Sequence, residues 1–176
     1  MSSFEMIVQA QSIELAAAGS RAVIVAEGLR VWQNTDGREL IARGPRLLAE
    51  SCRTGRLRVV PDRLGTVENT AETHAVVLAK NCRTEEMELT QRWYFNDEDA
   101  LVCELEFILP PAWEELETLG VEIDLPGEQP EFDLQAENGR IAFVSADSIH
   151  SAQVLLPDSP VKSGIWHMKL IFISKN

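Results

Sequence analysis

The most regular alternation of hydrophobic and polar residues along the chain runs from Met87 to Leu109. Two arms place apolar residues at every second position, and a wholly polar loop, residues 96–99, separates them. Side chains on one face of a β-strand recur with a period of two, whereas an α-helix repeats every 3.6 residues. The segment therefore predicts an antiparallel hairpin. Its apolar face should lie in the core, with Trp93 and Cys103 as core residues, and its acidic face should meet solvent.

Similar short segments occur along the rest of the chain, separated by Gly, Pro, Asn and Asp. Such spacing is typical of antiparallel sandwiches and barrels. We expect a single all-β domain over residues 1–176, an antiparallel β-sandwich of roughly ten to twelve strands with at most one or two short helices. The helical candidates are residues 13–18, which are rich in Ala, Leu and Glu, and residues 113–119, which follow the prolines.

Two dipeptides predict tight turns between neighbouring strands. Asp36-Gly37 should return the chain from residues 29–32 into a partner strand over residues 38–42. Asn138-Gly139 should join strands over residues 131–136 and 140–145 in a hairpin. Both dipeptides tolerate the positive φ angles that two-residue hairpin turns require.

Charge and cysteine content narrow the class of protein. The formal net charge is −12, which disfavours nucleic acid and anionic membrane surfaces as partners. The three cysteines are widely spaced and form no CxxC pair, so a zinc site is not expected.

No signal-peptide pattern or long apolar run appears at the N-terminus, and a cytoplasmic location is the default expectation. No nucleotide-binding, metal-binding or nucleophile motif is present, so we expect no cofactor and no catalytic residues, and an enzyme is the less favoured interpretation.

Six residues are the candidate binding site. Residues 52–65 carry the chain's basic cluster, and guanidinium groups can bind hydroxyl or anionic groups of a ligand. Trp113 follows two prolines and offers a ring on which a sugar could stack. The candidate binding residues are Arg53, Arg56, Arg63, His74, Trp113 and Glu122.

Two stretches carry a family resemblance. Residues 34–41, NTDGRELI, followed by Gly44-Pro45-Arg46-Leu47, resemble an early hairpin of galactose-mutarotase-like supersandwich domains. Residues 89–126 are similar to the same family in their long hairpin, proline-rich crossing and closing Leu125-Pro126. Those domains occur in sugar epimerases and as accessory domains of large glycoside hydrolases. The resemblance covers about half the chain, which is shorter than a full supersandwich. It offers His74 and Glu122 as nominal counterparts of the family's catalytic residues, without carrying catalysis onto them.

These observations leave three functions open. The first is a non-catalytic domain that binds carbohydrate, which the resemblance favours. The second is a protein-interaction module that dimerises through an exposed sheet edge. The third is a β-barrel that holds a small ligand in an apolar cavity.

Overall fold

The computed structural model describes residues 4–51, 55–69, 74–81, 88–109, 111, 116–156 and 164–175. These residues form fifteen strands in three antiparallel sheets and no α-helix. The all-β antiparallel sandwich predicted from the sequence is confirmed, with more strands than expected. One reason is that residues 13–17 of the first helical candidate belong to a strand. The other helical candidate, residues 113–119, lies partly outside the described residues.

Each sheet joins strands that are hydrogen-bonded to their neighbours in space. From edge to edge, the four-stranded sheet contains β1 (Glu5–Val8), β2 (Ser12–Ala17), β3 (Ser20–Val25) and β4 (Gly28–Gln33). The five-stranded sheet contains β13 (Arg140–Ala146), β14 (Ile149–Leu155), β11 (Thr118–Leu125), β5 (Arg43–Ser51) and β6 (Gly55–Val59). The six-stranded sheet contains β12 (Phe132–Glu137), β15 (Gly164–Ser174), β10 (Leu101–Leu109), β9 (Glu88–Phe95), β8 (His74–Asn81) and β7 (Arg63–Asn69).

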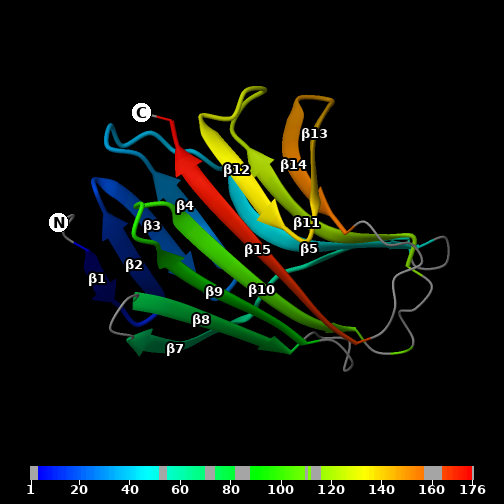
Figure 1. The fold of residues 1–176 in the computed structure, drawn as a ribbon, viewed down its shortest axis with the longest axis horizontal. Coiled ribbons are helices and arrows are strands. Elements are labelled where there is room, and N and C mark those ends of the chain that lie inside the picture. Colours follow the sequence, from blue (N-terminus) through cyan, green and yellow to red (C-terminus); the bar gives the residue numbers. More distant parts are fainter. Residues whose placement is uncertain are drawn as a thin grey trace.

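The six-stranded sheet forms one layer, and the other two sheets stand side by side behind it (Figure 1). Aromatic rings tie the layers together. Trp32 of β4 packs edge-on against Phe132 and Phe172 of the six-stranded sheet, with ring centroids 5.4 and 5.7 Å apart. Trp93 of β9 stacks on Phe172. All four rings are buried, so this cluster is the centre of the core.

The predicted hairpin is β9 and β10, paired in register from Leu101 opposite Phe95 to Ile108 opposite Glu88. Its apolar face is buried, as predicted, and includes Trp93 and Cys103. Burial and the charge of Glu104 raise the pKa of the Cys103 thiol well above its usual range. This thiol is therefore a core group without the reactivity of a thiolate.

Two predicted pairings are wrong. Residues 38–42 form no strand and pair with β4 at one isolated bridge, Gln33 to Glu39. On β4, β3 pairs with one side and β5 approaches the other. Asn138-Gly139 does reverse the chain, but the strands it joins part into different sheets: β12 pairs with β15, and β13 pairs with β14. The true hairpin of this region turns at Asp147-Ser148, where both residues have positive φ.

The two sheets of the back layer meet where β4 approaches β5. Gly44 permits this approach, since a Cβ there would lie 2.7 Å from the carbonyl oxygen of Leu29. The neighbouring Pro45 carbonyl accepts a hydrogen bond from Nε2 of the fully buried Gln91 on β9. Gln91 in turn accepts one from Nε1 of Trp93. This chain of contacts fixes the start of β5 against both neighbouring sheets.

Candidate functional site

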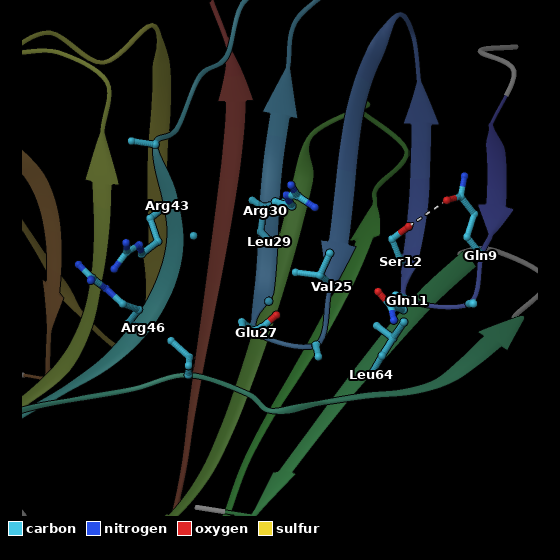
Figure 2. A pocket seen from close by; sticks show the side chains of 16 residues that line it. Gln9, Gln11, Ser12, Val25, Glu27, Leu29, Arg30, Arg43, Arg46 and Leu64 are labelled. Carbon is cyan, nitrogen blue, oxygen red and sulfur yellow. Dashed lines mark hydrogen bonds between the residues drawn. The ribbon is translucent and has the colours of Figure 1, made fainter.

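A cleft of about 1100 Å³ opens at this junction. It is bounded by the turn between β1 and β2, the turn between β3 and β4, the start of β5, and the connection from β6 to β7. Figure 2 shows Arg43 and Arg46 on one side, Gln9, Gln11 and Ser12 on the other, and Arg30 between them. The lining also includes Glu27 and the apolar side chains of Val25, Leu29 and Leu64.

A β-bulge supplies the first arginine of the cleft. On β4, Leu29 pairs with Ile24 and Val31 pairs with Val23, so Arg30 is an extra residue with no partner on β3. Bulges re-aim side chains and are frequent beside functional sites. Arg30 is exposed, and no hydrogen bond or ion pair joins its side chain to another described residue.

A second bulge places two more arginines on one face of the sheet. Opposite β11, Arg46 pairs with Glu122 and Arg43 pairs with Asp124, so three residues of β5 span the distance of two on β11. In a regular strand, positions three apart point to opposite faces. The bulge at Gly44-Pro45 instead brings both arginines to the side of the two carboxylates.

Glu122 is the centre of an ion network on this face. It accepts hydrogen bonds from Nη2 of Arg46 at 2.9 Å, Nε of Arg58 at 2.5 Å and Nε2 of Gln153 at 3.2 Å. Arg46 also donates to Asp124 at 2.6 Å. The Glu122 side chain is only 5% exposed, because its partners cover it.

The environment of Glu122 favours its charged form. Burial by itself raises the pKa of Glu122, but the hydrogen bonds from Arg58 and Gln153, with the charges of Arg58 and Arg46, outweigh burial and lower the pKa. The same contact with Glu122 raises the pKa of Arg58. Glu122 is thus held as a carboxylate, suited to orienting arginines rather than to proton transfer.

The network leaves a cationic side chain incompletely satisfied. Nε of Arg46 is buried and has no hydrogen-bond partner among the described residues, although the Nη2 of the same side chain serves two carboxylates. A buried N–H without a partner costs free energy. Arg46 lines the cleft, although this Nε is itself shielded from solvent. The amides of Gln9 and Gln11 and the hydroxyl of Ser12 add donors and acceptors on the opposite side.

The predicted site residues do not gather in one place. Glu122 lies in the ion network beside the cleft. Arg56 is on β6 and pairs with Glu50 at the surface, and Arg63 is exposed at the start of β7. The side chains of Arg53, His74 and Trp113 lie outside the described residues, although the His74 backbone begins β8.

The three arginines that line the cleft were not among the residues predicted from the sequence. A period of two assigns faces by counting residues, and each bulge breaks the count. One signal was present: Gly44-Pro45 within an otherwise strand-like segment marks a bulge or an edge. No residue next to Arg30 in the sequence predicts the bulge at that position.

The other histidines lie apart. His150 on β14 bonds Ser145 across the β13–β14 hairpin at 2.6 Å, and His167 on β15 is 3.5 Å from Glu106. Within the described ranges, no group of three or more His, Cys, Asp or Glu is placed to bind a metal ion. The same ranges contain no helix long and apolar enough to cross a membrane.

Comparison with known proteins gives no further guidance to function. No protein-family model matches the chain, and no curated protein matches it significantly.

Proposed function

We propose that this protein is a non-catalytic binding domain whose cleft holds an acidic carbohydrate, that is, a hydroxylated molecule carrying a carboxylate or phosphate. The observation that carries the proposal is the placement of Arg30, Arg43 and Arg46 around one cleft in a chain whose net charge is −12. Guanidinium groups bind carboxylates and phosphates through charge-assisted hydrogen bonds.

The remaining lining supports a hydroxylated ligand. Gln9, Gln11 and Ser12 supply amide and hydroxyl groups, which can both donate to and accept from sugar hydroxyls. Val25 and Leu29 supply apolar contact for the ring carbons. The described lining includes no aromatic residue, so recognition here rests on arginine rather than on ring stacking. A barrel with an apolar cavity, one of the alternatives from the sequence, receives less support from a lining with three arginines.

The acidic group of the ligand should be the main determinant of affinity. We expect glucuronate or glucose 6-phosphate to bind the purified protein at millimolar concentration, and glucose to bind at least about tenfold more weakly. Arg30→Ala should lower the affinity for the acidic sugars by about tenfold, since it removes a charged donor. Isothermal titration calorimetry and ligand-observed NMR would measure both effects.

Arg38→Ala is the matched control, because Arg38 is exposed, pairs with Glu131 at the surface and does not line the cleft. It should leave the affinity unchanged. The proposal fails if neither acidic sugar binds at millimolar concentration, or if Arg30→Ala and Arg38→Ala have equal effects. A preference for one acidic sugar would show whether the group recognised is a carboxylate or a phosphate.

A further inference from the structure

The edge formed by β13 differs from the other sheet edges that the structure describes. β13 closes one side of the five-stranded sheet and pairs only with β14. Its six residues from Ile141 to Ala146 carry no charge and no proline. Exposed edge strands normally carry charges, prolines or bulges, or stay very short, because their free N–H and C=O groups can pair with another chain.

The other edge strands have such protection. Three of them carry charged residues: β6, β7 and β12 contain Arg58, Glu68 and Asp133, respectively. β1 is only four residues long and begins with Glu5. β4 carries the Arg30 bulge and lies beside β5. Among the described strands, β13 is therefore the edge best suited to pairing.

Apolar side chains are exposed on both faces of this edge. Phe143 is 56% exposed on one face, and Val144 and Ile149 are 39% and 66% exposed on the other. Val144 and Ala146 share one face of β13, and Ile149 lies on that face because it pairs with Ala146. Phe143 points to the opposite face. The β13–β14 hairpin stands at the margin of the molecule (Figure 1). A strand added alongside β13 would cover apolar surface above and below the sheet.

We infer that β13 is a self-association site, at which the occupant is β13 of a second copy of this chain in antiparallel pairing about a twofold axis. Such an axis places one residue of β13 opposite the same residue of the second copy. That residue is Phe143 or Val144, which gives two possible registers. In either register, Arg140 of one copy comes within one residue of Asp147 of the other. Each end of the interface then brings opposite charges near each other, around an uncharged centre. This charge complementarity favours a second copy over an unrelated strand.

The pairing joins two five-stranded sheets into one continuous ten-stranded sheet. The cleft lies at the junction of the two back-layer sheets, separated from β13 by β14 and β11, and stays open in the dimer. This inference is independent of the proposed ligand, and each can fail without the other.

Sedimentation velocity over a concentration series tests the inference. The wild type should pass from monomer to dimer as concentration rises to about 1 mM. Val144→Lys places a charge at the centre of the edge and should leave only monomer over that range. Arg140→Glu sets like charges near Asp147 and should weaken the dimer at least about tenfold. Ile7→Lys, at an exposed position on the edge strand β1, is the matched control and should dimerise as the wild type does.

Circular dichroism checks that each variant is folded. If Val144→Lys does not fold, the effect of Arg140→Glu on dimerisation tests the inference alone. A wild type that is monomeric at about 1 mM overturns the inference. The inference is also overturned if folded β13 variants still dimerise as the wild type does, or if Ile7→Lys abolishes the dimer as completely as the β13 variants do.

Discussion

Glu122 shows how one carboxylate can organise several cations. Its two oxygens accept from Arg46, Arg58 and Gln153, and the side chain has almost no contact with solvent. Removing one member of a buried ion network leaves the remaining charges buried without a partner. The free-energy cost of this loss exceeds the stability that the intact network adds over a well-packed apolar substitute. The network should therefore be sensitive to the loss of Glu122 and to its protonation.

Glu122→Gln should lower the free energy of unfolding at pH 7 by about 2 kcal/mol. The pKa of Glu122 is lowered in the folded state from its ordinary value of 4.5. Its contribution is therefore complete above that value and is lost as the pH falls through the lower, folded-state pKa. The difference between wild type and variant should shrink in acid. Urea unfolding at several pH values would measure this.

Glu106→Gln provides the control, because Glu106 is half-exposed and contacts only His167 among its described charged neighbours. It should change stability by less than about 0.5 kcal/mol. An effect of Glu122→Gln that is equal at pH 7 and in acid would contradict the account of the network.

At the scale of the strand, β5 combines a close approach with a change of face. Gly44 lies against Leu29 of β4, and Pro45 receives the hydrogen bond from Gln91. The next residue, Arg46, then points to the same side as Arg43. One dipeptide thus joins two sheets and orients the cleft arginines.

Gly44→Ala should destabilise the protein by about 1–3 kcal/mol, because the added methyl group meets the backbone of Leu29 and β4 must move. Gly127→Ala is the control, since no atom lies within 4 Å of a Cβ at that position and its backbone is not left-handed. Urea unfolding would compare them. Equal stability of the two variants would show that the β4–β5 approach is not tight.

The strand scale also shows what the sequence could predict. The β9–β10 hairpin follows from its own residues, because alternation holds over both arms and the loop is short. The Arg46–Glu122 contact joins residues 76 positions apart, and alternation alone gives no register between such strands. Asn138-Gly139 indicates a reversal correctly, but a turn residue does not decide whether the flanking strands pair.

At the scale of the whole molecule, the aromatic cluster holds the layers together. Trp32 from the four-stranded sheet packs against Phe132 and Phe172 of the six-stranded sheet. The five-stranded sheet is joined to β4 through β5. Neither sheet of the back layer can separate without exposing buried surface of the others.

The chain should therefore unfold in one cooperative transition. Tryptophan fluorescence reports on the buried Trp32 and Trp93, whereas far-ultraviolet circular dichroism reports on all strands. The two unfolding curves in urea should coincide, which is a test of two-state behaviour. Two separated transitions would mean that the back-layer sheets unfold independently, against the single-domain prediction.

The bulge on β4 makes the charge of the cleft depend on the number of residues in the strand as well as on their type. Deleting one residue between Arg43 and Arg46 would remove the β5 bulge and restore simple alternation, with both arginines still on the side of the two carboxylates. Deleting Arg30 would remove the other bulge without disturbing the pairs on either side. A single-residue deletion, which usually only damages a sheet, is at Arg30 a direct route to a cleft of different ligand preference.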